Sequence, residues 1–138
     1  MKSNKGFSLV ELIVVIAIMA IIAAVAVPVY NTYITKADTA VINQSIDDAI
    51  YATKLANIEY TCGATIKVNG TTMTITFGDG ETTSTKAAAA QVAKVLNAST
   101  PTSNVVTVTL TKSATDSEKS IVISATGVVT SDYRKTNA

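Results

Sequence analysis

The stretch that decides the fold is FSLVELIVVIAIMAIIAAVAVPVY, residues 7–30, in which 21 of 24 residues are apolar. Of the 108 residues that follow, 44 are apolar. Because an α-helix rises about 1.5 Å per residue, a helix over residues 7–29 is about 35 Å long. That length crosses a bilayer core of about 30 Å with a small tilt. The sequence therefore predicts a transmembrane helix at residues 7–29, followed by a domain of ordinary size.

Two lysines, Lys2 and Lys5, precede this stretch without an acidic residue beside them. Positive charge next to a membrane helix stays on the cytoplasmic side, so residues 30–138 are expected to face outward. A secretory signal peptide is the competing interpretation. Its apolar region spans about 7–15 residues before a cleavage site of small residues. The apolar stretch here is longer and runs on into a continuing helix, which favours the membrane anchor.

Glu11 does not fit a plain anchor. A carboxylate at the centre of a membrane helix costs roughly 2.5–3.5 kcal/mol on insertion scales. Glu11 either lies shallowly, with its carboxylate among the lipid headgroups, or it pairs with a partner inside the membrane. The residues alone leave both interpretations open.

The residues KGFSLVEL at 5–12, with the apolar run and Pro28 behind them, closely resemble the N-terminus of type IV prepilins and their class III signal peptide. The resemblance covers about residues 1–36. It implies that a membrane aspartic peptidase removes the leader, residues 1–6, by cleavage after Gly6, and methylates the new amino terminus of Phe7. It also implies that Glu11 is the family's assembly acid, paired with the amino terminus of Phe7 in a neighbouring subunit.

Pro28 is the third expected assembly residue, beside Phe7 and Glu11. It has no N–H for the carbonyl of Ala24, and its ring crowds that carbonyl, so a kink is expected between these residues. In filaments of the family this stretch can melt into extended chain. Many members have a Gly where this chain has Ala20, and Ala favours helix by about 1 kcal/mol. A plain kink and a short melted stretch both remain open.

Behind the anchor the pattern becomes that of an α+β domain, residues 30–138. The helix is expected to continue to about Thr61, with Gly63 as its stop. Its predicted buried stripe is Ile34, Ala37, Val41, Ser45, Ala49, Ala52 and Ala56, widened by Ile42, Ile46, Ile50 and Thr53. Five strands are predicted at residues 65–68, 72–77, 105–111, 121–125 and 128–133. Asn69-Gly70 is expected to turn the first hairpin with positive φ at both residues. A short helix at 86–96 is expected to begin at Ser84 or Thr85 as its N-cap. An antiparallel sheet packed on the rear half of the long helix follows.

Composition argues against an enzyme. The chain has no His, which excludes imidazole bases and His-dependent triads, and its one Cys, Cys62, is interpreted as a small buried hydrophobe. No catalytic residue, cofactor or metal is predicted: Gly78-Asp79-Gly80-Glu81 is interpreted as a solvated turn rather than a calcium loop. Arg134 and Lys135 are interpreted as a solvated end. The net charge of +1 argues against nucleic-acid binding.

The resemblance implies a structural subunit that waits in the cytoplasmic membrane, as a single-pass protein with its head outside, and polymerises into a surface pilus for adhesion or motility. The expected partners are identical subunits, the prepilin peptidase and the pilus assembly machinery. Two alternatives stay open: a pseudopilin of a type II secretion or competence machine, and a membrane-anchored binding module that never polymerises. Because no Cys follows Cys62, the disulfide of many Gram-negative pilins is missing, which points toward the Gram-positive type.

Overall fold

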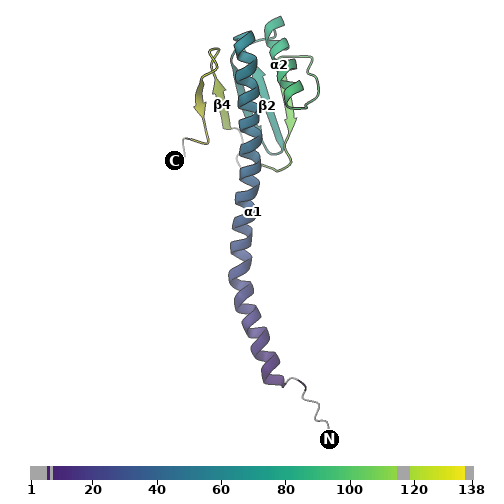
Figure 1. Cartoon of the computed structure of the whole chain (residues 1–138), viewed down its shortest axis with the longest axis vertical. Helices are drawn as coiled ribbons and strands as arrows, with labels where there is room; N and C mark the ends of the chain where they lie inside the picture. The colour runs from purple at the N-terminus through teal and green to yellow at the C-terminus, as the bar shows by residue number, and fades with distance from the viewer. Residues whose placement is uncertain (1–5, 7, 115–118, 136–138) are drawn as a thin grey trace. The chain divides into compact units, whose positions relative to one another are not determined.

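The structure is a computed structural model that describes residues 6, 8–114 and 119–135. The chain divides into two compact units, Met1–Ala37 and Asp38–Ala138, and each is described by itself. Along the chain the elements are α1 (Leu9–Tyr60), β1 (Ala64–Asn69), β2 (Thr72–Phe77), α2 (Thr83–Val95), β3 (Val105–Thr109), β4 (Lys119–Ile123) and β5 (Val129–Asp132) (Figure 1). The predicted α+β fold, with one long helix and a five-stranded antiparallel sheet, is confirmed.

In the first unit, α1 continues through Pro28 without a break (Figure 1). The missing N–H of Pro28 removes one backbone hydrogen bond to Ala24, but this loss does not end the helix. One turn later, the Thr32 hydroxyl donates to the Pro28 carbonyl over 3.0 Å. Whether the stretch from Ala24 to Pro28 melts in an assembly stays a prediction.

In the second unit, α1 buries a stripe of its residues: Ile42, Ile46, Ala49, Ile50, Ala52, Thr53, Ala56 and Asn57. The predicted stripe was wrong at its front, because Ile34 and Val41 stay exposed. The rest of the prediction holds from Ile42 onward, where Ala49, Ala52 and Ala56 and the widening residues Ile42, Ile46, Ile50 and Thr53 are all buried. The apolar spacing continues toward the front of the helix, but the core that the sheet provides begins only at Ile42.

The end of α1 lies near the predicted stop. The helix ends at Tyr60, and Thr61 and Gly63 both take positive φ, of 47° and 66°. A Cβ at Gly63 would lie 3.0 Å from the Ile123 carbonyl oxygen, so the site accepts only Gly without adjustment. The buried Asn57 side chain accepts the Gly63 N–H over 3.1 Å and donates to the Ser124 carbonyl over 3.4 Å. Asn57 thereby ties the helix end to the chain that follows β4.

The sheet has the strand order β3-β2-β1-β4-β5, and every neighbouring pair is antiparallel. In the first hairpin Asn69 pairs with Thr72, so the loop is Gly70-Thr71 rather than the predicted Asn69-Gly70. Only Gly70 has positive φ, at 58°, whereas positive φ was predicted at both Asn69 and Gly70. A Gly with positive φ at the first loop position is typical of a type II′ turn, which suits the twist of a hairpin as well as the predicted turn does.

The two faces of the sheet differ as strand alternation requires. One face, which includes Ile66, Ile75 and Phe77, is fully buried and packs in one core cluster with the buried stripe of α1 and with Ala88 and Val92 of α2. The other face is rich in Thr. Strand bounds differ from the prediction by about two residues: β3 ends at Thr109 and β4 runs Lys119–Ile123 rather than 121–125.

The start of α2 corrects the predicted N-cap. Thr82 is the N-cap, and the helix runs Thr83–Val95, where 86–96 was predicted. The Thr85 N–H donates to the Thr82 hydroxyl over 3.2 Å, and the Thr82 N–H donates to the Thr85 hydroxyl over 2.7 Å. Thr82, Ser84 and Thr85 are all suitable caps by residue type. Thr82 has the further advantage that the hydroxyl of Thr85, three residues later, accepts the Thr82 N–H. As an N-cap, neither Ser84 nor Thr85 makes such a bond.

Candidate processing and assembly site

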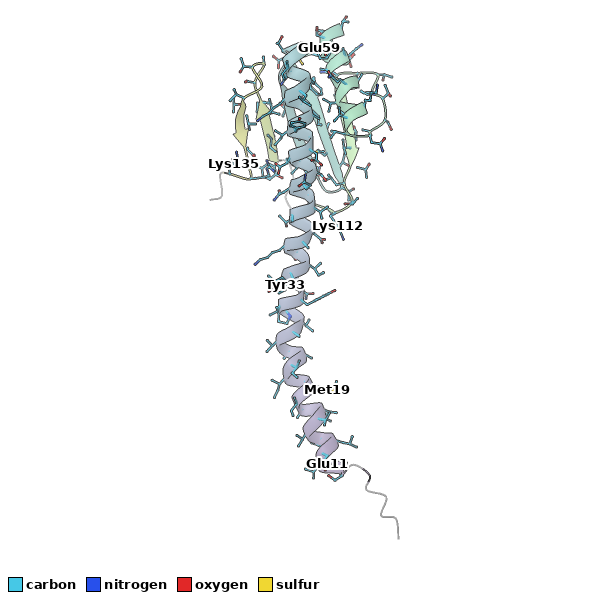
Figure 2. The ribbon with its side chains drawn as sticks, viewed as in Figure 1. Glu11, Met19, Tyr33, Glu59, Lys112 and Lys135 are labelled. Atoms are coloured by element: carbon cyan, nitrogen blue, oxygen red, sulfur yellow. The ribbon has the colours of Figure 1, made fainter. Side chains whose placement is uncertain are left out.

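The first turn of α1 is closed by two side chains, Ser8 and Glu11. The Ser8 N–H donates to Glu11 Oε2 over 3.1 Å, and the Glu11 N–H donates to Ser8 Oγ over 3.3 Å. The first helical bond follows from the Leu12 N–H to the Ser8 carbonyl over 3.2 Å. This reciprocal pair is a capping box, which satisfies two of the backbone donors that a helix start leaves free. Figure 2 shows Glu11 at this first turn.

The capping box gives Glu11 a role within its own chain, besides the role in assembly that the resemblance implies. Its carboxylate lies where the helix dipole favours negative charge. Only Oε2 is used: Oε1 has no hydrogen-bond partner among the residues that the structure describes. Glu11 can therefore close the first turn of its own helix and still accept a second partner through Oε1. The Ser-x-x-Glu spacing was the available sequence signal for Ser8.

The apolar run of α1 is exposed on every face in the first unit (Figure 2). Its large side chains range in exposed fraction from 75% at Leu9 to 48% at Val29. The run holds an 18-residue window that is long and apolar enough to cross a membrane, and no part of that window is buried within the protein. A helix that is hydrophobic all round requires an apolar environment, either lipid or other helices. This surface is therefore incomplete in the single chain.

The predicted processing residues fall largely outside the described part of the chain. Lys2, Lys5 and Phe7 lie there, so nothing is said of their structure. Gly6 is described and exposed, and a Cβ at this position would meet no atom within 4 Å. The chain itself therefore does not require Gly at position 6. Cleavage after Gly6 and methylation of Phe7 stay predictions, as do the assembly roles of Glu11 and Pro28.

Cys62 does not have the surroundings of a reactive thiol. It is partly buried against the core cluster, and its thiol lies 3.8 Å from Asn57 Oδ1. Burial raises the pKa of the Cys62 thiol above its ordinary value, so the thiol stays protonated at neutral pH. A protonated thiol is a poor nucleophile and a poor metal ligand.

The described residues contain no group of three or more Cys, Asp or Glu side chains that could hold a metal ion. In the Gly78–Glu81 turn, the Glu81 carboxylate lies 3.3 Å from the Lys86 ammonium group, so this acid is paired with a cation. The Gly80 carbonyl accepts the Thr85 hydroxyl over 2.9 Å. The turn thus serves the start of α2.

Arg134 corrects the interpretation of the C-terminal end as simply solvated. Its side chain is only 17% exposed and binds the buried Asp132 carboxylate through two nitrogens, at 3.0 and 2.8 Å. A third nitrogen reaches Asp47 on α1 over 2.7 Å. The Arg134 guanidinium holds the pKa of Asp132 below its usual range, mainly through the hydrogen bonds between the two side chains. This arginine joins the end of β5 to α1.

Comparison with known proteins bears on the front of the chain. The family model described as the prokaryotic N-terminal methylation motif matches residues 1–27. No curated protein and no solved structure matches the chain. The motif implies processing by a prepilin peptidase and assembly into a pilin-type filament, and with the apolar helix it fits a membrane-anchored precursor. The chain thus carries the class III signal of type IV prepilins at residues 1–27, joined to a long apolar helix, and this motif points to a type IV pilin-like structural subunit.

Proposed function

We propose that this chain is a structural subunit of a type IV pilus, which polymerises through the N-terminal part of α1 into a surface filament for adhesion or motility. The observation that carries the proposal is the apolar run of α1, which is exposed on every face and lies almost entirely within the methylation motif at residues 1–27. Lipid covers this run in the precursor, and the same run of neighbouring subunits covers it in the filament.

The physical gain on polymerisation comes from close packing. Moving the run from lipid into a bundle of helices gives little hydrophobic gain, because lipid tails are as apolar as the side chains. Small residues at a helix interface allow close backbone approach, and the run carries five of them: Ala17, Ala20, Ala23, Ala24 and Ala26. These positions suit a tightly packed filament core.

Processing and pairing at the front of the chain complete the proposal. Cleavage after Gly6 removes Lys2 and Lys5 and creates a positive, methylated amino terminus on Phe7. That group supplies a cation for Glu11 Oε1 in a neighbouring subunit, an oxygen without a hydrogen-bond partner among the described residues. In a low-dielectric environment a paired carboxylate is tolerated where a lone one is costly, so this pairing also sets the axial register between subunits. The partners are identical subunits, the prepilin peptidase and the assembly machinery, and the cytoplasmic membrane holds the precursor.

Electron microscopy of the source cell, with and without this gene, tests the proposal. Loss of long surface fibres on deletion, and their return on complementation, is the expected result. A pseudopilin shares the same front end, and short filaments seen only on overexpression would identify one. Recovery of the chain as a membrane monomer that never enters a fibre, in cells with an active prepilin peptidase, would contradict the proposal.

A further inference from the structure

The face of α1 that points away from the sheet in the second unit carries an ordered row of exposed side chains. We name this row the outer stripe; its members are Val41, Gln44, Asp48, Tyr51, Leu55 and Ile58. Exposed fractions reach 65% at Tyr51 and 78% at Ile58, which is high for large apolar residues. Steps of three and four residues alternate along the stripe, which is the a/d spacing of a coiled coil. The stripe is therefore shaped to receive another helix.

Two polar residues interrupt the stripe at its middle. The Gln44 side-chain amide donates to Asp48 Oδ1 over 2.9 Å, so the two form one polar step within the row. Asp47 beside them binds Arg134. Lys54, about one turn and a half further along, makes no ion pair within the described ranges of the chain. α1 thus carries an acidic side chain, Asp48, within the stripe and, among the described residues, an unpaired cation, Lys54, beside it.

These charges decide between two registers of a parallel pair. If two copies of α1 pack level, each Asp48 faces the Asp48 and Asp47 of its neighbour, and like charges in contact are unfavourable. Displacing one copy by seven residues, about 10 Å, preserves the a/d spacing. In the heptad of the stripe, Asp48 is an a position and Lys54 is a g position. In parallel coiled coils a g-position side chain flanks the a position of the neighbouring helix, so Asp48 then lies beside Lys54 of the next copy. Tyr51 then faces Ile58 of the next copy.

We infer that a second copy of this chain docks its α1 on the outer stripe, parallel and displaced by seven residues, with Asp48 of one copy paired to Lys54 of the next. This inference rests on the proposed function, since subunits inserted in one membrane share one orientation. The Gln44–Asp48 pair fixes the axial alignment of the two helices, as a buried polar residue does in coiled coils.

A charge exchange tests the pairing in full-length protein expressed in piliated cells. D48K and K54D are each expected to lower the yield of sheared filaments about tenfold or more, because each creates like charges in contact. The double variant, D48K with K54D, is expected to restore the yield. K67D, on the Thr-rich outer face of the sheet, is the matched control and should assemble normally.

The outcomes separate the inference from the proposed function. If the unaltered chain forms no filament, the proposed function fails and the inference falls with it. If the unaltered chain polymerises and D48K and K54D polymerise equally well, the inference is overturned while the proposed function stands. Loss in both single variants without recovery in the double variant also overturns the pairing.

Cross-linking provides a second readout that does not depend on altered charge. In a C62S background, filaments of the Y51C/I58C variant are treated with a short bismaleimide, which joins two thiols by alkylation. A ladder of covalent multimers is expected, because each subunit links to one above and one below. Y51C alone and I58C alone should remain monomeric. Dimers from Y51C alone would indicate level packing and overturn the displaced register.

Discussion

Ser8 and Glu11 hold the first turn of α1 together, and this pairing changes how the acid at the front of the chain is understood. A capping box satisfies part of the carboxylate within its own helix. The cost of an acidic residue near the membrane is therefore lower before assembly than for an unpaired carboxylate. The remaining oxygen of Glu11 is the group that we propose for contact between subunits.

Replacing Glu11 by Gln separates the two roles of this residue. Gln closes a capping box as Glu does, so the start of α1 is preserved, but Gln carries no charge for a neighbouring amino terminus. E11Q is expected to insert in the membrane and to be processed at normal levels while filament yield falls sharply. Immunoblots of membrane and sheared-filament fractions measure both quantities. Normal filaments from E11Q would show that the charge of Glu11 is not needed.

Replacing Ser8 by Ala removes the hydroxyl that accepts the Glu11 N–H. Losing an N-cap side chain costs about 1 kcal/mol, so hydrogen exchange of the Glu11 amide should quicken about fivefold in full-length protein in detergent. S8T keeps the hydroxyl and should exchange at nearly the original rate. Equal exchange rates in the S8A and unaltered proteins would mean that the capping box does not form in solution.

At the scale of elements, α2 shows how a capping residue is chosen. T82A removes the N-cap hydroxyl and should lower the stability of the second unit by about 1 kcal/mol, or about 4–8 °C in Tm for a domain of this size. S84A, two residues later, is the matched control and should change Tm by much less. Thermal unfolding of the full chain, followed by circular dichroism, compares the two. A larger loss in S84A would restore Ser84 as the cap.

The elements also show what the sequence could and could not predict. Existence and type were predictable for both helices and all five strands, because apolar spacing and turn residues give those signals directly. The buried stripe of α1 was predicted correctly from Ile42 onward but extended too far toward the front, since Ile34 and Val41 continue an equally apolar row. The first hairpin loop was shifted by one residue because Asn69-Gly70 and Gly70-Thr71 both offer an acceptable turn.

The site was less predictable than the fold. The motif around Gly6, Phe7 and Glu11 is readable from residue type and spacing alone, and the family model matches the same stretch. The bonds of Arg134 were not readable, since Asp47 lies 87 residues away and only the folded sheet brings it near. Ser8 was missed although its spacing from Glu11 carried the signal.

At the scale of the whole molecule, the C-terminal end is held by charge rather than by a disulfide. Arg134 joins Asp132 to Asp47 across β5 and α1. R134Q leaves the Asp132 carboxylate buried without its cation, which should cost about 3 kcal/mol in stability. Urea unfolding of the full chain in detergent measures the loss. K135Q, at the neighbouring position, should have little effect, and equal midpoints for both variants would contradict the role of Arg134.

The same pairing predicts sensitivity to acid. Because the folded pKa of Asp132 is depressed, its stabilising contribution is present above the ordinary Asp pKa of about 4 and disappears as pH falls through the folded pKa. The unaltered protein should therefore lose stability as pH is lowered below about 4. The R134Q variant should lose less stability over the same pH range, because without Arg134 the pKa of Asp132 is not depressed in the folded state. If the stability of both proteins falls equally steeply with decreasing pH, other carboxylates cause the loss.

The central claim is that this chain is cut after Gly6, methylated at Phe7 and built into a filament. Intact mass spectrometry of protein from sheared, washed surface fibres tests all three steps in one measurement. We predict a chain that begins at Phe7, lacks residues 1–6 and carries one additional methyl group at its amino terminus. A chain in the fibres that retains its leader, or fibres that do not contain this chain at all, would contradict the account.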